Sequence, residues 1–258
     1  MRRIRRPVPP VAAGALAITL ATGLATGLAA CGDNGEPSGA HGPTTIAGGC
    51  ATDSAVVRQA RVLSRADLNG DGHADTLSLT AARGSCANTL VAHVGGRFAS
   101  LPLRSTRVTP TTVTLVQVPG RRGLLVSARE SHPRGGFQLH LYAYGGHRLV
   151  ELTTPSGAPL VPFVSSDTDP TPLSTSCGHG TVIVDQGVPH EPPGIAFAWD
   201  IHRTVYTVSG TRVTSQRGRE IAASVLPALL PKRFPALAHH VFFRDCAAAS
   251  PGSGTVAP

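Results

Sequence analysis

The segment ADLNGDGHAD, residues 66–75, concentrates oxygen-bearing side chains in a chain that holds only 15 acidic residues. Asp67, Asn69 and Asp71 occupy alternate positions of a glycine-rich stretch. This spacing lets short carboxylate and amide side chains converge on one point, as in loops that bind hard cations. The segment is therefore the first candidate for a metal site.

The next residues complete the candidate donor set. Gly72 permits the sharp turn that brings the carbonyl oxygen of His73 round as a further ligand. Asp75, at the ninth position of the loop, closes the site directly or through a water molecule. Oxygen donors with three negative charges favour Ca²⁺ over softer metals. The expected cofactor is one Ca²⁺ ion, held by Asp67, Asn69, Asp71, His73 and Asp75.

The continuation of the chain separates this loop from an EF-hand. An EF-hand carries a bidentate glutamate at the twelfth position, where this chain has Ser78, and continues as a helix. Here the strand-like TLSLT follows instead. The alternative to a metal site is a solvated polar turn, because Asn-Gly and Asp-Gly pairs form turns readily.

The run D-x-N-G-D-G-x-x-D followed by a strand resembles the calcium loop of the FG-GAP and VCBS repeat families. The resemblance extends from Val62 to Leu103 and includes TLVAHVGGRFASLPL, with its glycine turn. It implies a repeat of the β-propeller type with a structural Ca²⁺ ion. Two later units of the chain lack the acidic loop, and one has Arg121 and Arg122 where the acids would be.

Alternating side chains predict strands through the rest of the domain. In FQLHLYAY, residues 137–144, the odd positions are apolar and the even positions carry Gln, His and Tyr, which is the period of a strand. TLVAHVGGRFASLPL, FQLHLYAYGGHRLVEL and HRTVYTVSGTRVTSQ each predict two strands joined by a glycine turn. A short apolar strand precedes each of them, at 76–80, 123–128 and 181–185.

The turn glycines Gly96, Gly146 and Gly210 mark a repeat whose third unit is lengthened by the proline-rich GVPHEPPG. The expected fold is therefore all-β, with β-meander repeats resembling a small or incomplete β-propeller. An irregular β-sandwich is the alternative. One helix is expected from about Arg219 to Leu230, kinked or split by Pro227, and HVFFRDC is a candidate closing strand.

The N-terminus has the anatomy of a secretory signal over residues 1–30. MRRIRRP is cationic, an uncharged apolar stretch follows, and the stretch ends in small residues. A retained membrane helix is the alternative, since twenty residues just span a bilayer. Leu28-Ala29-Ala30-Cys31 resembles the lipobox of bacterial lipoproteins, which implies lipid on Cys31 and attachment to the extracytoplasmic face of the cell membrane.

Composition predicts the remaining boundaries. Residues 31–49 are rich in Gly, Pro, Ser and Thr and are expected to form a flexible tether. Residues 50–246 are long enough for one domain with its own core. Residues 247–258 repeat the composition of the tether and are expected to be a disordered tail.

Cysteine content fits export. With Cys31 assigned to lipid, four cysteines remain, an even number for an oxidising compartment. Three pairings are possible, and chain proximity favours Cys50–Cys86 with Cys177–Cys246. A zinc site is the weaker alternative, because no C-x-x-C or Cys/His cluster occurs.

The charge of the chain argues against nucleic acid as a partner and says little about other partners. Cleavage after residue 30 removes four of the 23 basic residues and none of the 15 acidic ones, so the net charge falls from +8 to +4. The pairs Arg121-Arg122 and Lys232-Arg233 are not interleaved with aromatic residues and are expected to be solvated. The expected partners are the membrane, through its lipid, and an envelope protein or polymer.

No short catalytic motif occurs in the sequence. The best candidates for a reactive site are His190-Glu191 in the proline-rich insertion and the pair His239-His240. Trp199 and Asp200 adjoin the insertion; Trp199 is expected in the core, and the alternative is that the two residues line a sugar-binding face. The sequence therefore predicts an envelope binding or scaffold module with a structural Ca²⁺ ion, and the alternative is an envelope hydrolase with its site near residues 187–200.

Overall fold

The computed structural model describes residues 60–80, 88–103, 111–132, 135–165, 170–191, 194 and 197–248, and the backbone of three short strands at 44–46, 50–52 and 254–256. All of these residues belong to one compact unit, Gly42–Pro258. The predicted signal sequence, Cys31, most of the tether and Cys86 lie outside the described residues, as does the side chain of Cys50.

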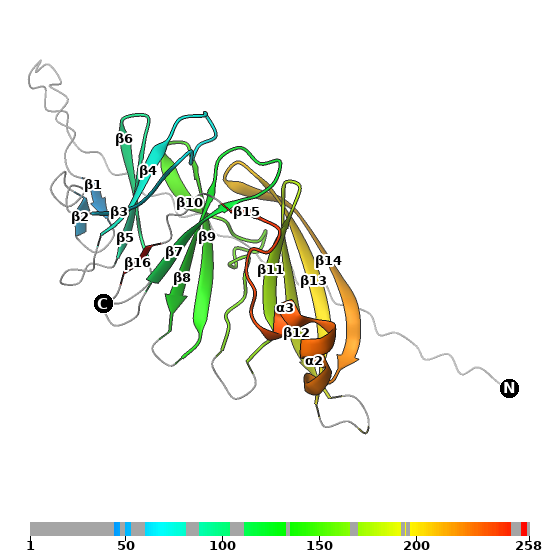
Figure 1. Cartoon of the computed structure of the whole chain (residues 1–258). Coiled ribbons are helices and arrows are strands. Elements are labelled where there is room, and N and C mark those ends of the chain that lie inside the picture. Colours follow the sequence, from blue (N-terminus) through cyan, green and yellow to red (C-terminus); the bar gives the residue numbers. More distant parts are fainter. Residues whose placement is uncertain are drawn as a thin grey trace, which may run out of the picture. The chain divides into compact units, whose positions relative to one another are not determined.

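Three four-stranded antiparallel meanders form the body of this unit (Figure 1). The first sheet consists of β3 (Arg61–Ala66), β4 (Asp75–Thr80), β5 (Thr89–Val94) and β6 (Arg97–Pro102). The second consists of β7 (Thr111–Gln117), β8 (Leu125–Ser131), β9 (Phe137–Gly145) and β10 (Arg148–Glu151). The third consists of β11 (Leu173–Gly178), β12 (Thr181–His190), β13 (Ala198–Ser209) and β14 (Arg212–Val225).

The all-β prediction is confirmed, and each unit holds one strand more than the sequence pattern indicated. The predicted strand at 76–80 and the glycine hairpin after it correspond to β4, β5 and β6. The sequence pattern missed β3, β7 and β11, the first strand of each sheet. β1 (Thr44–Ile46) and β2 (Cys50–Thr52) pair with each other outside these sheets.

Two-residue turns connect the third and fourth strands of each sheet, as the glycines predicted. Val94 pairs with Arg97 across Gly95 and Gly96, whose φ angles are 54° and 77°. In the second sheet the turn residues are Gly146 and His147, with φ of 57° and 63°. Positive φ at both central positions defines a type I′ turn, whose twist matches that of the flanking strands.

The second sheet is buried on both faces, and this explains why its strands are so apolar. On one face Leu139, Leu141 and Ala143 join a cluster with Leu173 and Val184 of the third sheet. On the other face, Tyr142, Tyr144 and Leu149 join a cluster with side chains of the first sheet, among them Leu77, Leu90 and Ala92. The alternation predicted for residues 137–144 therefore separates two hydrophobic interfaces.

The C-terminal helical segment begins later than predicted. Residues 219–225 continue β14, which pairs with β13 as far as Val225. Short helical turns follow: η1 (Pro227–Leu229), α2 (Leu230–Arg233) and α3 (Pro235–Ala238). Pairing with the long strand β13 outweighs the helix propensity of the Ala- and Glu-containing 219–225 segment. Leu230 and Leu237 then pack against the core residue Trp199.

The chain beyond α3 follows the edges of two sheets. Residues 241–246 form one parallel bridge, Ser176 to Arg244, rather than the closing strand expected there. The N–H of Cys177 donates to the carbonyl of Arg244 at 2.9 Å. β15 (Ala247–Ala248) and β16 (Gly254–Val256) then pair with β7, within a stretch that was expected to be disordered.

The Cys177–Cys246 disulfide ties this C-terminal segment to β11. Its sulfur atoms are 2.07 Å apart, and the bond closes a loop with a sequence separation of 69 residues. The predicted pairing of these two cysteines is thus confirmed, and it fits an oxidising compartment. The Cys50–Cys86 pairing concerns atoms outside the described residues and stays a prediction.

Replacing Cys246 with Ala is expected to lower the free energy of unfolding by about 2–4 kcal/mol, because the unfolded chain regains the freedom of a long loop. Cys246 is the better position to change, since it is only partly buried whereas Cys177 is 7% exposed. Urea unfolding without reductant measures the difference. Adding reductant should destabilise the unmutated protein much more than the variant, and equal stability without reductant would contradict the prediction.

Candidate functional site

The predicted metal loop connects β3 to β4, and hydrogen bonds within it hold it in a closed turn. Asp67 accepts the N–H of Gly70 at Oδ1, 2.6 Å, and the N–H of Gly72 at Oδ2, 2.9 Å. At the other end of the loop, Oδ2 of Asp75 accepts the N–H of Leu68 at 2.9 Å. Both glycines have positive φ, 83° and 87°, which they adopt without the penalty of a Cβ atom.

Asn69 and Asp71 bond to each other at the tip of the loop. Nδ2 of Asn69 donates to Oδ2 of Asp71 at 2.7 Å, and the N–H of His73 donates to Oδ1 of Asp71 at 2.8 Å. These two hydrogen bonds, the first being the stronger cause, hold the pKa of Asp71 below its ordinary value. Asp71 therefore keeps its negative charge at neutral pH.

The pKa of Asp75 is shifted in the opposite direction, above its ordinary value. Asp75 is 5% exposed, and burial is the main cause that raises its pKa. The hydrogen bond from the Leu68 N–H opposes this shift, and the charges of Asp71 and Asp67 add to it. A raised carboxyl pKa means that the surroundings disfavour the negative charge. The three aspartates therefore repel one another in this loop, and a bound cation would relieve that repulsion.

Asp67, Asn69, Asp71 and His73 lie in the loop between β3 and β4, and Asp75 is the first residue of β4. The side-chain oxygens of the three aspartates and of Asn69 accept hydrogen bonds from the loop itself. Among the described residues, no three His, Cys, Asp or Glu side chains are already grouped as a metal site. The donor chemistry fits Ca²⁺, and occupancy stays a prediction.

The same loop forms the contact between the first and second sheets. The N–H of Leu124 donates to the carbonyl oxygen of Asp67 at 3.1 Å. A Cβ on Gly70 would lie 2.6 Å from Cβ of Arg122, and one on Gly123 would lie 2.6 Å from the carbonyl oxygen of Leu68. The two backbones approach this closely only because both positions are glycine.

A second contact of this kind joins the β7–β8 loop to the third sheet. The N–H of Gly180 donates to the carbonyl oxygen of Pro119 at 2.7 Å, and a Cβ on Gly120 would collide with the ring of His179. Arg121 reaches further along the third sheet, where Nη2 donates to the carbonyl oxygen of Gly210 at 3.0 Å.

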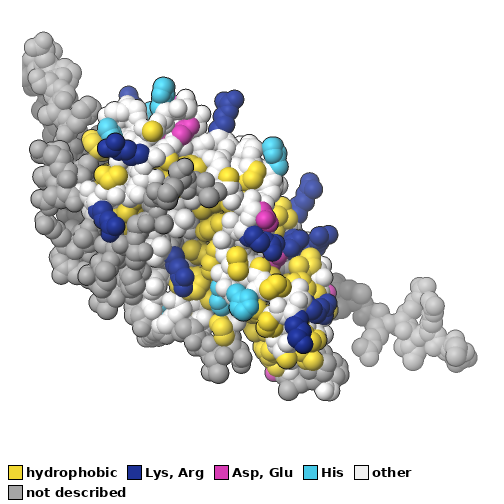
Figure 2. Space-filling model, in the orientation of Figure 1, with side chains coloured by type: hydrophobic (Ala, Val, Ile, Leu, Met, Phe, Trp, Pro, Cys, Tyr) yellow, Lys and Arg dark blue, Asp and Glu magenta, His cyan; other side chains and the backbone are white. Residues whose placement is uncertain are grey.

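Arg121 is not the solvated arginine that the sequence predicted. Nη1 donates to the carbonyl oxygens of Arg122 and Gly123, and burial lowers its pKa. An arginine remains charged in proteins even so, because its ordinary pKa is above 12. Its role is to bind backbone carbonyls where the sheets meet. Figure 2 shows other Lys and Arg side chains scattered over the visible face, without a continuous basic stripe.

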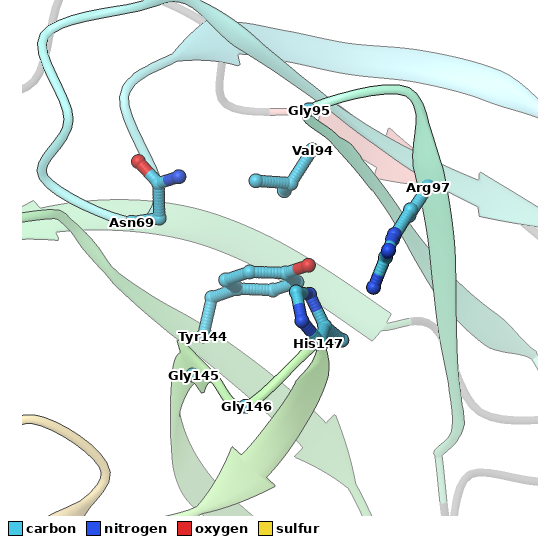
Figure 3. Close-up of a pocket in the computed structure, with 8 residues that line it drawn as sticks. All are labelled: Asn69, Val94, Gly95, Arg97, Tyr144, Gly145, Gly146 and His147. Carbon is cyan, nitrogen blue, oxygen red and sulfur yellow. The ribbon is translucent and has the colours of Figure 1, made fainter.

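A pocket of about 300 Å³ lies beside the acidic loop (Figure 3). Two hairpin turns form its walls, Val94–Gly95 with Arg97 from the first sheet and Tyr144–His147 from the second, and Asn69 adds the loop. This pocket was missed by sequence reasoning. The sequence did predict the two glycine turns that line the pocket. It gave no indication that these turns lie next to each other in the folded chain.

Tyr144 stands out among the lining residues. Its side chain is 8% exposed, and its hydroxyl is buried without a hydrogen-bond partner among the described residues. Burial raises its pKa, as does the charge of Asp75, whereas Arg97 lowers it. Figure 3 shows the hydroxyl directed toward Arg97, with the ring of His147 beside it.

The histidine of the proline-rich insertion has an acidic partner. Nδ1 of His190 lies 2.6 Å from Oδ2 of Asp200, and Oδ1 of Asp200 accepts the N–H of Ser224 at 2.8 Å. Both hydrogen bonds hold the pKa of Asp200 below its ordinary value, and the bond from Ser224 is the larger cause. Within the described part of the chain, Nε2 of His190 has no hydrogen-bond partner.

The remaining sequence candidates are not brought together. Glu191 and His239 are exposed, and Nε2 of His240 lies 3.2 Å from the carbonyl oxygen of Thr171. Trp199 is 5% exposed and packs against Phe197 at a centroid distance of 4.9 Å, so its expected place in the core is confirmed. No helix among the described residues is long and apolar enough to cross a membrane.

Comparison with protein-family models, with curated proteins and with solved structures finds no match to this chain.

Gly70→Ala should destabilise the domain more than Gly72→Ala, by about 1–3 kcal/mol. Both positions have positive φ, so both variants incur a similar backbone cost. Only at Gly70 would the new methyl group collide with Arg122 and Gly123, whereas a Cβ on Gly72 meets nothing within 4 Å. Urea unfolding in excess chelator compares the two, and equal losses would show that the loop does not pack on the second sheet.

Proposed function

We propose that this chain is a lipid-anchored, extracytoplasmic binding or scaffold module of the bacterial cell envelope, with one structural Ca²⁺ ion in its first loop. The export and lipidation signals of residues 1–31 support the location. The Cys177–Cys246 disulfide supports it independently, because such bonds persist in oxidising compartments.

The observation that carries the structural role of the loop is its position between two sheets. Asp67 uses its side chain to hold the turn and its carbonyl oxygen to bind Leu124 of the second sheet. A cation held by the loop would therefore fix the contact between sheets. Asp67, Asn69, Asp71 and Asp75, with the carbonyl of His73, nearly complete a Ca²⁺ shell and leave little room for a substrate.

A binding role is supported by the pocket beside this loop. Its walls are turns anchored in two packed sheets, so the side chains on them are presented by a rigid support. Arg97, His147 and Tyr144 are side chains that bind polar ligands, and about 300 Å³ is at the lower end of the range for ligand pockets.

An envelope hydrolase remains the second candidate, and the His190–Asp200 pair favours it. A carboxylate on Nδ1 orients a histidine so that Nε2 acts as a base, which is the arrangement of hydrolytic triads. His190 is 37% exposed, so a substrate has access to it. Among the described residues no hydroxyl or thiol bonds to Nε2 of His190.

Calcium at 1 mM should raise the melting temperature of the mature protein by roughly 3–6 °C over a sample in excess chelator. With a dissociation constant on the order of 0.1 mM, the ion stabilises by RT ln(1 + 10), about 1.4 kcal/mol. Thermal melts monitored by circular dichroism measure the shift.

Asp71→Ala should remove most of this calcium-dependent shift, although it also changes the melting temperature in chelator by breaking the turn. The matched control is His190→Ala, which should keep the full shift. Identical melts of the unmutated protein with calcium and with chelator would mean that the loop is only a polar turn.

Cys31→Ala should abolish lipidation, because the acyl chains of the predicted anchor are attached through this cysteine. Cells fed radiolabelled palmitate measure the incorporated lipid. Cys50→Ala serves as the control and should retain the label. Label in the Cys31→Ala protein would overturn the lipid anchor and leave the calcium prediction unaffected.

A further inference from the structure

The strongest unexplained feature of the described surface is the buried hydroxyl of Tyr144 in the pocket between the first two sheets. A buried polar group without a partner costs about 1–3 kcal/mol. Tyr144 is held in this place by the packing of its ring in the cluster between the two sheets. The described part of the domain therefore leaves this donor unpaired in a surface pocket, which is typical of a group that pairs with a ligand.

The protonation state of Tyr144 makes that group a donor. Burial raises its pKa above an ordinary value that already lies well above physiological pH. The hydroxyl is therefore neutral at physiological pH and carries its proton. No acceptor among the described residues bonds to this hydroxyl, and Oδ2 of Asp75 accepts the N–H of Leu68 instead.

The rim of the pocket carries the positive charge of Arg97 and the imidazole of His147. Both side chains are exposed; His147 lies on its hairpin turn and Arg97 directly follows the opposing turn, and they flank the Tyr144 hydroxyl in Figure 3. Asn69 adds an amide, and the described lining contains no Asp or Glu. The lining thus offers a guanidinium, an imidazole and a phenol donor around one space, which suits a ligand rich in acceptor oxygens.

We infer that this pocket binds a small molecule through an anionic group, a carboxylate or a phosphate, with Arg97 pairing with the charge and Tyr144 donating a hydrogen bond. Arginine matches the geometry of both anions by donating two parallel hydrogen bonds. The exposed side chains of Arg97 and His147 must swing aside to admit the group to the hydroxyl. The inference rests on the proposed binding role and specifies the chemistry of its ligand.

The fold provides a matched control for Arg97. Arg97, Arg148 and Arg212 each begin the fourth strand of a sheet, directly after the two-residue turn. All three are exposed, and Arg97 is the one that lines the pocket. A loss of binding that is specific to Arg97 therefore reports the pocket and excludes a general effect of surface charge.

Isothermal titration of the mature protein in 1 mM Ca²⁺ tests the inference with three probes: glucuronate, glucose 6-phosphate and glucose. At least one anionic sugar should bind at least about 10-fold more tightly than neutral glucose. Arg97→Gln should weaken that binding by about 10-fold or more, which is the range for hydrogen bonds to charged groups. Arg148→Gln should leave it unchanged.

Tyr144→Phe separates binding from folding. The substitution removes a hydroxyl that has no partner among the described residues, so the melting temperature without ligand should not fall. Affinity for the anionic sugar should drop about 3- to 10-fold, corresponding to the loss of one hydrogen bond.

The two anions distinguish the possible sources of the charged group. Preference for glucuronate indicates a carboxylate ligand, and preference for glucose 6-phosphate indicates a phosphate ligand; either result supports the inference. Equal binding of glucose would overturn the anionic ligand while leaving a binding role intact. Failure of both anions to bind at 10 mM, or binding that Arg97→Gln leaves unchanged, would also overturn it.

Discussion

The burial of the second sheet on both faces is the constraint on which the rest of this structure depends. Its side chains alternate between a cluster shared with the first sheet and a cluster shared with the third. A sheet that is covered on one side only can carry polar residues on the other side. Here neither face is free, so three meanders of modest size share continuous apolar contact, as neighbouring blades of a propeller do.

Close packing of the faces brings the connecting loops together, and glycine decides how near they come. Gly70 and Gly123 allow the first and second loops to touch backbone to backbone, and Gly120 accommodates the ring of His179 from the third sheet. Arg121 adds hydrogen bonds to the carbonyl oxygen of Arg122 in its own loop and to that of Gly210 in the third sheet. The acidic loop thus contributes to the architecture whether or not it binds an ion, and an ion would strengthen a contact that already exists.

The pocket is a further consequence of this packing. Two hairpin turns of the same type face each other, and Tyr144 is held in place because its ring belongs to the core between their sheets. The acidic loop contributes Asn69 to the lining, and the charge of Asp75 acts on Tyr144. The acidic loop and the pocket are therefore neighbours at the first two sheets, whereas the His190–Asp200 pair lies on β12 and β13 of the third.

The sequence by itself determined the β-meanders and the hairpin turns. These properties are local: alternation along a strand and positive φ at glycine depend on neighbouring residues. The sequence also favoured the Cys177–Cys246 pair, because these two are consecutive cysteines along the chain. Tertiary structure decided the first strand of each sheet, the extension of β14 through residues 219–225, the buried role of Arg121 and the pocket at Tyr144. Each of these depends on which strand or loop from another part of the chain lies alongside, and no local pattern records such contacts between distant residues.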